Sequence, residues 1–364
     1  MIEKNKITNY QKIAIINTAF IGDVLLSIFL AQQIKNFHPN SKIFFITSSR
    51  LFELLNCVKA IDKIITYDKH TKDKGIQGFI TIVQKIRQEQ VKLILAPHRS
   101  ARTSLISFFS HPVFSVSYDT SSLKFLYKKT VKYQHTLHEI ERNFELLRPF
   151  DDVVFPLGLP TVDFVFPNNL PGKIAALLGE SFEKEKIIAM APGSVWKTKQ
   201  WLPERFQYLG TELQKAGYKV VLIGGEDDRL LCEEIAKNSG ALNIAGETSL
   251  VESLYLIKQS KLLITNDSSP THLASLTDCP CITIYGPTIP EFGFYPRSKK
   301  SRIIQVENLK CKPCSIHGYN RCPLKHHDCM KLINEKDVLN TALELLSDKG
   351  FHIDTAHFTN SIKS

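Results

Sequence analysis

Short runs of β-branched residues alternate with helical patterns along most of the chain, and this alternation restricts the folds open to it. Residues 12–17 form the first such run, and a turn at Gly22 leads into an apolar stretch with helical spacing at 24–34. Three more pairs follow, with strands predicted at 42–47, 63–67 and 92–96 and helices at 51–55, 76–87 and 101–109. Strands that alternate with helices build a parallel sheet with helices on both faces. The first part of the chain is therefore predicted to be a doubly wound α/β domain.

The alternation stops at a proline-rich segment and then starts again. After a helix predicted at 137–147, residues 151–170 show no helical period and form the expected linker. Strands are then predicted at 186–190, 219–223, 242–245, 261–265 and 281–285, with helices at 204–216, 227–237, 250–259 and from about residue 269. We therefore expect Rossmann-like domains at 1–160 and 161–348 and a loosely ordered tail at 349–364. Two such domains place a ligand cleft between the carboxyl ends of two sheets.

Length and composition agree with this two-domain interpretation. A chain of 364 residues with 43% hydrophobic residues can bury two separate cores. The first residues are polar, and no stretch reaches the roughly 18 consecutive apolar residues of a membrane-spanning helix. The sequence thus predicts a globular protein that is neither exported nor membrane-spanning.

The positive charge is concentrated in the first half. Residues 1–160 contain 22 Lys and Arg against 13 Asp and Glu, which gives them +9 of the net charge of +10. This excess suits nucleic acid, a phosphorylated substrate or an anionic membrane surface, and charge alone does not choose between them. A solvated basic surface that only maintains solubility is the remaining alternative.

A carboxylate stands at the start of the first predicted helix, at the carboxyl edge of the first sheet. Asp23 follows Gly22 there. A single Asp at a helix start commonly caps it by accepting hydrogen bonds from free backbone N–H groups. The functional alternative is a general base in the cleft.

The second domain carries phosphate- and sugar-binding residue types after two of its strands. Ser194, Thr198 and Lys199 follow the first of these strands, where hydroxyls and a cation could hold phosphate oxygens. The spacing is not that of a P-loop, and a plain strand-to-helix turn is the alternative. Glu226 follows the glycine pair 224–225 and could bind the vicinal hydroxyls of a ribose, or simply cap the next helix.

A third loop of this domain joins a buried strand to a helix that has a proline in its first turn. Free N–H groups and the positive end of that helix favour an anion at this point. Asp267 could cap the turn or hold a sugar hydroxyl, Ser268 and Ser269 add hydroxyl donors, and His272 could reach a phosphate or sugar oxygen. A packed structural histidine is the alternative for His272.

Four motifs in this order resemble the family 9 glycosyltransferases, and within them the ADP-heptose:lipopolysaccharide heptosyltransferases of the heptosyltransferase II type, over residues 12–345. The motifs are Ile21-Gly22-Asp23-Val24, Ala191-Pro192-Gly193-Ser194 with Lys199, Trp201 and Pro203, Gly246-Glu247-Thr248-Ser249-Leu250, and residues 266–274 followed by Tyr285-Gly286-Pro287-Thr288. The resemblance implies a GT-B fold, in which two doubly wound Rossmann-like domains face a central cleft. It also implies an inverting enzyme without a metal or other cofactor that moves a heptose from ADP-heptose to a heptose of the lipopolysaccharide inner core. Such an enzyme works in the cytoplasm, peripheral to the inner membrane.

The same resemblance assigns roles to individual residues. Asp23 matches the catalytic base and Lys199 the lysine near the donor phosphates. Glu226 falls near the ribose-contacting acid, and residues 267, 268, 269 and 272 match the donor-binding loop. The basic first half then suits a lipopolysaccharide acceptor, which carries carboxylates and phosphates at an anionic bilayer surface. His98, Arg99 and Arg102 are the acceptor-binding candidates, with plain surface charge as the alternative. No feature predicts an oligomeric state.

Four clustered cysteines remain. Cys311, Cys314, Cys322 and Cys329 have a spacing that could hold a structural zinc ion, but reduced thiols in a packed loop or disulfides fit it too, and none of these alternatives is catalytic.

Two rival functions stay open at the level of sequence. One is a GT-B transferase with another nucleotide-sugar donor or acceptor. The other is a basic nucleic-acid-binding protein with a zinc element, which we do not expect because it leaves the loops at Asp23 and Asp267 without a role.

Overall fold

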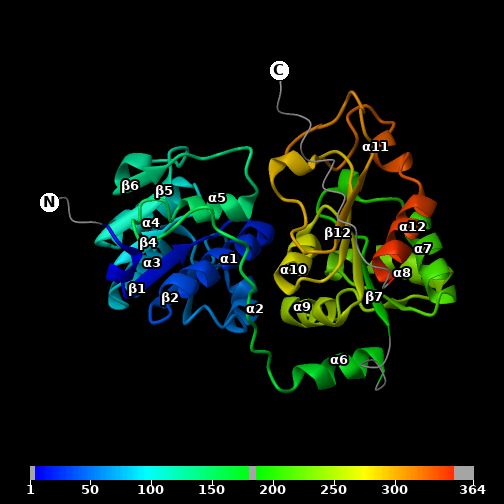
Figure 1. Ribbon diagram of the computed structural model, residues 1–364, viewed down its shortest axis with the longest axis horizontal. Coiled ribbons are helices and arrows are strands. Elements are labelled where there is room, and N and C mark those ends of the chain that lie inside the picture. The colour runs from blue at the N-terminus through cyan, green and yellow to red at the C-terminus, as the bar shows by residue number, and fades with distance from the viewer. Residues whose placement is uncertain (1–4, 180–185, 348–364) are drawn as a thin grey trace.

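The computed structural model describes residues 5–179 and 186–347, which form two α/β domains joined by an extended segment (Figure 1). The expected loose tail at 349–364 lies outside the described residues. Each domain contains one six-stranded sheet, and all strand pairs within both sheets are parallel. The predicted fold class, two doubly wound Rossmann-like domains, is confirmed.

The N-terminal sheet has the strand order β3-β2-β1-β4-β5-β6. Its strands are β1 (Lys12–Ile16), β2 (Lys42–Thr47), β3 (Lys63–Thr66), β4 (Leu93–Leu95), β5 (Phe114–Tyr118) and β6 (Lys129–Val131). The helices of this domain are α1 (Ile21–Phe37), α2 (Phe52–Asn56), α3 (Gly75–Gln88), α4 (Ala101–Phe109) and α5 (Glu139–Glu145), with short 3-10 turns η1 (Ile7–Asn9), η2 (Ser49–Leu51) and η3 (Lys124–Leu126). The strand order reverses between β1 and β4, and open α/β sheets bind ligands at this kind of switch point.

The C-terminal sheet repeats this arrangement with the order β12-β11-β10-β7-β8-β9. Its strands are β7 (Ile187–Ala191), β8 (Lys219–Leu222), β9 (Leu242–Asn243), β10 (Leu262–Asn266), β11 (Cys281–Tyr285) and β12 (Ser301–Gln305). The helices are α6 (Leu170–Leu178), α7 (Pro203–Lys215), α8 (Arg229–Ser239), α9 (Leu250–Gln259), α10 (Ser269–Thr277), α11 (Asp328–Lys331) and α12 (Glu335–Leu346), and the 3-10 turns are η5 (Lys197–Lys199), η6 (Glu226–Asp228) and η7 (Pro290–Phe292). Here the order reverses between β7 and β10, so the loops after these two strands flank the switch point.

Helix α1 lies between its own sheet and the other domain. Every residue from Val24 to Ile34 is buried, a pattern typical of a helix that is covered on all sides. One face of α1 packs on the sheet, and the opposite side contacts α10 of the C-terminal domain (Figure 1). The start of α1, with Asp23, is thereby held at the boundary between the domains.

Helix α5 forms a second contact between the domains. The backbone N–H of Glu139 donates to the carbonyl of Gly293 at 2.8 Å, and Arg142 donates from Nη2 to the carbonyl of Phe292 at 2.7 Å. Farther along the same loop, Arg297 pairs with Glu141 at 2.6 Å. These contacts hold the loop after η7 against the N-terminal domain.

The described helices include none that is long and apolar enough to cross a bilayer.

Candidate active site

Asp23 is the third residue of α1, and Phe20 occupies the N-cap position without a side-chain hydrogen bond. Asn17, just after β1, fixes the loop by donating from Nδ2 to the carbonyl of Asp23 at 3.1 Å. Burial is the largest influence on the Asp23 carboxyl and raises its pKa to about 6, although backbone N–H groups and the nearby Arg99 and Arg142 act in the opposite direction. A carboxylate with such a pKa is matched to taking a proton near neutral pH.

His272 of α10 reaches across the domain boundary to the same place. A Cβ atom on Gly22 would lie 2.9 Å from Cδ2 of the His272 ring, so only a glycine lets the ring approach this closely. Burial lowers the pKa of His272 to about 4, which keeps the ring neutral. Its Nδ1 atom is buried without a hydrogen-bond partner among the described residues.

A buried ion pair stands at the switch point of the C-terminal sheet. Lys199 follows β7 and Asp267 follows β10, and Nζ of the lysine lies 2.6 Å from Oδ2 of the aspartate. The hydroxyl of Thr288 donates to the same carboxylate oxygen at 2.6 Å. The structure therefore brings together two of the predicted donor-site residues.

Asn266, at the end of β10, links this strand to the loop that follows β7. It is fully buried, donates from Nδ2 to the carbonyl of Pro192 at 2.7 Å and accepts from the backbone N–H of Trp201 at 3.1 Å. Ser268 is the N-cap residue of α10 and makes no side-chain cap hydrogen bond, and Ser269 begins the helix. The positive end of α10 and the ammonium group of Lys199 thus favour an anion at the same switch point.

The remaining predicted donor residues lie in two different settings. Glu226 lies at an exposed position next to Gly246, where a Cβ would come within 2.4 Å of its Oε2 atom. Ser194 lies in the loop after β7, where its hydroxyl is 3.4 Å from the backbone N of Trp196. Thr198 is buried, and its hydroxyl donates to the carbonyl of Tyr319 and accepts from the Tyr319 N–H, both at 2.8 Å. The Thr198 hydroxyl is therefore already hydrogen-bonded within the protein.

A second carboxyl group near Asp23 was not predicted from the sequence. Glu139 is buried at the start of α5, where burial and then the charge of Asp23 raise its pKa to about 7. Its carboxylate pairs with Arg142 at 2.9 Å, and that guanidinium also donates to the hydroxyl of Tyr133 at 3.0 Å. Asp23 therefore has a second carboxyl group, that of Glu139, and a guanidinium group, that of Arg142, as electrostatic neighbours.

The predicted acceptor residues gather at the end of β4. Nδ1 of His98 lies 3.1 Å from the hydroxyl of Thr18 and 3.0 Å from that of Thr103, within hydrogen-bonding distance of both. Burial lowers the pKa of His98 to about 4, so the ring is neutral and links the two loops by hydrogen bonds. Arg99 is exposed and lies over the ring of Tyr133 at 4.0 Å.

Two further contacts complete this cationic cluster. Arg102 donates to the hydroxyl of Tyr67 at 3.0 Å. Arg102 also lies near Lys69, a residue that was not predicted from the sequence, and the pKa of Lys69 is lowered by burial and by the charge of Arg102. Lys69, Arg99 and Arg102 thus form a cluster of cations on the N-terminal side of the boundary.

The cysteine-rich segment packs on the loop after β7, which carries Thr198 and Lys199. The four cysteines are free thiols, and within residues 5–179 and 186–347 no three His, Cys, Asp or Glu side chains are placed to hold a metal ion. The zinc alternative thus finds no ligand set there. Instead, Cys314 donates its N–H to the carbonyl of Pro287, and a Cβ on Gly318 would lie 3.3 Å from Cγ of Lys199. The segment packs against the side chain of Lys199 and limits the conformations that this side chain can adopt.

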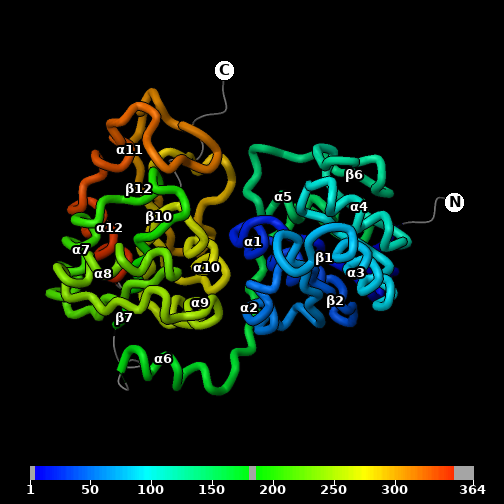
Figure 2. Tube along the Cα trace, turned by 180° about the vertical axis from the view of Figure 1, so that it is seen from behind, coloured from blue at the N-terminus to red at the C-terminus, as the bar shows by residue number. Residues whose placement is uncertain are grey.

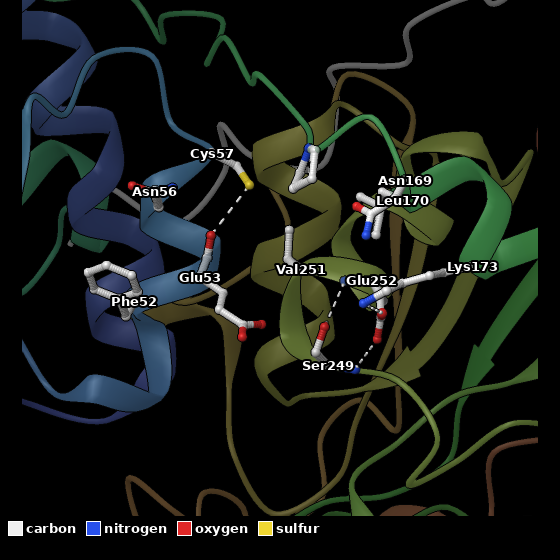
Figure 3. A pocket seen from close by; sticks show the side chains of 11 residues that line it. Phe52, Glu53, Asn56, Cys57, Asn169, Leu170, Lys173, Ser249, Val251 and Glu252 are labelled. Carbon is white, nitrogen blue, oxygen red and sulfur yellow. Dashed lines mark hydrogen bonds and ion pairs between the residues drawn. The ribbon is translucent and has the colours of Figure 1, made fainter.

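A cavity of about 250 Å³ between the domains lies apart from these residues (Figure 3). Helix α2 lines one side with Phe52 and Glu53, and Leu170 and the ion pair of Lys173 with Glu252 line the other. It contains none of the predicted site residues.

The family model described as "Glycosyltransferase family 9 (heptosyltransferase)" matches residues 79–322, which is more than half of the chain. The chain belongs to glycosyltransferase family 9. It is 25% identical over 313 residues to the lipooligosaccharide heptosyltransferase 2 of Haemophilus ducreyi, and the match covers 81% of this chain and 89% of that one.

Solved structures share the fold of this family 9 chain. A glycosyl transferase family 9 protein from Veillonella parvula has a TM-score of 0.81 at 20% identity, covering 92% of this chain and 97% of the other. The E. coli ADP-heptose LPS heptosyltransferase II has a TM-score of 0.75 at 22% identity, with 92% and 98% covered. The chain is thus a glycosyltransferase with two Rossmann-like domains.

Proposed function

We propose that this glycosyltransferase moves a heptose from ADP-heptose to a heptose of the lipopolysaccharide inner core, with inversion at the anomeric carbon and without a metal ion. The observation that carries the proposal is the meeting of two half-sites across the domain boundary. Asp23 lies beside Gly22, Gly22 packs on His272 of α10, and the start of α10 adjoins the pair of Lys199 and Asp267.

Each half-site has a defined task in this reaction. Asp23 removes the proton of the acceptor hydroxyl as the oxygen attacks the anomeric carbon, and the bond from that carbon to the diphosphate breaks through an oxocarbenium-like transition state. The leaving ADP gains negative charge. Lys199 and the positive end of α10 stabilise that charge, so the protein can supply what a metal ion supplies elsewhere.

The other predicted residues bind the two substrates. Ser194, Thr198, Asp267, Ser268, Ser269 and His272 line the donor side, with Glu226 toward the ribose. The Thr198 hydroxyl is engaged by Tyr319, so Thr198 acts by shaping the loop. Arg99, Arg102 and Lys69 attract the anionic groups of the acceptor, with His98 holding their loop. Relatives named for ADP-heptose and for lipooligosaccharide support these substrates. We place the enzyme in the cytoplasm at the inner membrane, where such an acceptor is built.

A titration with nucleotides tests the donor. ADP, and not UDP or GDP, should raise the unfolding temperature by several degrees when present at about 100 times its dissociation constant. Transfer from ADP-heptose to a truncated core acceptor should then persist in the presence of EDTA. Stabilisation by UDP instead would keep the glycosyltransferase and replace the donor, and inactivation by EDTA that added metal reverses would refute metal independence.

The pH dependence tests the role of Asp23. Only the ionised carboxylate accepts a proton, so kcat/KM should rise with pH along a limb centred near pH 6, the pKa to which burial raises Asp23. Arg99→Gln removes a cation whose charge lowers the pKa of Asp23, so the limb should move up in pH in this variant. Glu139 has a pKa of about 7 and is therefore mostly protonated where Asp23 titrates, so Glu139→Gln is the control and should leave the limb in place. An unmoved limb in Arg99→Gln would contradict the coupling of Arg99 to Asp23.

A further inference from the structure

The charge excess of the whole chain lies in one segment. Residues 69–132 contain 12 Lys and Arg and only 3 Asp and Glu, so they hold +9 of the net +10. In the structure this segment forms α3, β4, α4, β5, η3 and β6. Strands β4, β5 and β6 make up one half of the N-terminal sheet, and α4 contacts both α3 and η3. Lys124, Lys128 and Lys129 are exposed at η3 and β6, and within the described residues none of these three has an ion-pair partner.

The same segment exposes large apolar side chains. Ile76, Val113 and Phe125 are 77%, 61% and 78% exposed. Phe108 and Phe109 at the end of α4 are exposed as well, and the Phe109 ring meets Phe79 of α3 at 5.9 Å. Because Arg87 of α3 also donates to the Phe109 carbonyl at 2.7 Å, the two helices present one continuous surface.

This surface turns away from the other domain and begins at the active site. In both views α3 and α4 lie on the side of the N-terminal domain that faces away from the C-terminal domain (Figures 1 and 2). Helix α4 starts next to Arg99 and Arg102 of the cationic cluster and runs for nine residues, about 14 Å, to Phe109. An acceptor that is anchored beside α3 and α4 could therefore reach the cluster.

We propose that α3, α4 and η3, together with the loops that carry Val113 and Lys128, dock on a bilayer that contains anionic lipids; we call this surface the docking face. The inference rests on the proposed function, since it supplies the place where a lipid-borne acceptor meets the enzyme. The lysines are attracted to the negative leaflet, and the apolar side chains enter the boundary between headgroups and acyl chains. A phosphate backbone would satisfy the lysines but would leave Ile76 and Val113 without a partner, so a membrane fits the face better than nucleic acid does.

Vesicle co-sedimentation of the full chain tests the docking face. We expect binding to vesicles of phosphatidylcholine with phosphatidylglycerol and at least about tenfold weaker binding to phosphatidylcholine alone. The charge-reversed variant Lys124→Glu/Lys128→Glu/Lys129→Glu should lose about a hundredfold or more in affinity. The apolar variant Ile76→Ser/Val113→Ser/Phe125→Ser should lose about tenfold. The matched control Lys237→Glu/Lys258→Glu/Lys261→Glu reverses three exposed lysines of the C-terminal domain and should leave binding unchanged.

The outcomes separate the docking face from the proposed function. Equal binding to both kinds of vesicle, or undiminished binding by the two docking-face variants, would overturn the docking face, as would tighter binding of RNA than of vesicles through the same lysines. Transfer to a truncated acceptor without lipid should be equal in the wild type and in both variants, because none of the six residues contacts the site. If the wild type binds anionic vesicles through this face but transfers no heptose, the proposed function fails while the docking face stands.

Discussion

Asp23→Asn is expected to lower kcat for heptose transfer by about a thousandfold, because the amide keeps the shape of the side chain but cannot accept the proton of the acceptor hydroxyl. General base catalysis typically contributes about 10² to 10⁴ in rate. The partly buried position of Asp23, where desolvation raises its pKa to about 6, makes replacement by bulk water inefficient. Single-turnover transfer from ADP-heptose to a truncated core acceptor measures the effect directly.

A binding measurement separates this loss from a disturbed fold. Asparagine carries no charge, so it avoids the cost that burial imposes on the carboxylate, and the variant should unfold at the same or a slightly higher temperature than the wild type. Its affinity for ADP should stay within about twofold, since the proposed nucleotide site lies on the other domain. An Asp23→Asn enzyme that keeps a tenth or more of the wild-type kcat would remove Asp23 from the role of base.

Lys199→Ala is the second large effect that we expect, with a loss of about 10² to 10³ in kcat/KM and weaker binding of ADP. The lysine is the cation placed at the start of α10, and removing one preorganised partner of a developing charge typically costs this much. The alanine variant also leaves the Asp267 carboxylate, which is 7% exposed, without its counter-ion, although Thr288 still donates to it at 2.6 Å. A buried charge without its counter-ion destabilises a protein, so the unfolding temperature should fall as well.

Two further variants distinguish a loss of catalytic activity from a loss of stability. Lys197→Ala removes an exposed lysine from the same turn and should leave kcat/KM within about twofold of the wild type. The double variant Lys199→Met/Asp267→Asn removes both charges, which should restore much of the lost stability without restoring transfer. Recovery of transfer in the double variant would show that Lys199 only neutralises Asp267.

The alternation of strands and helices predicts the architecture well because a parallel sheet with helices on both faces leaves a regular hydrophobic pattern. Strand β5 was missed because it reads Phe-Ser-Val-Ser-Tyr, whereas buried parallel strands are expected as continuous apolar runs. Ser117 is fully buried there, and its hydroxyl donates to the carbonyl of Ala96 at 2.8 Å. Hydrogen bonds that compensate a buried hydroxyl depend on the neighbouring strand and are invisible along the sequence.

The candidate site likewise contains residues that the sequence predicts and residues that it does not. Asp23, Lys199 and Asp267 follow strands at the two switch points, and the order of the strands puts such positions together in any fold of this class. Glu139 could not be found by this argument, since it begins α5 and comes near Asp23 only through the packing of α5 on α1. Thr198 could not be assigned correctly to a partner either, because Tyr319, which engages its hydroxyl, is 121 residues away in the sequence.

The contact of His272 with Gly22 bears on a side reaction that every glycosyltransferase must suppress, the loss of its activated sugar to water. The proposed base belongs to one domain and the proposed diphosphate site to the other, and the His272 ring and Gly22 touch where the two domains meet. A separation of the domains during substrate exchange would break that contact and move Asp23 away from the donor side. A water molecule that entered between the separated domains would then find the nucleotide sugar without a base beside it. The division of the proposed site between two domains would thereby protect the donor from hydrolysis between turnovers.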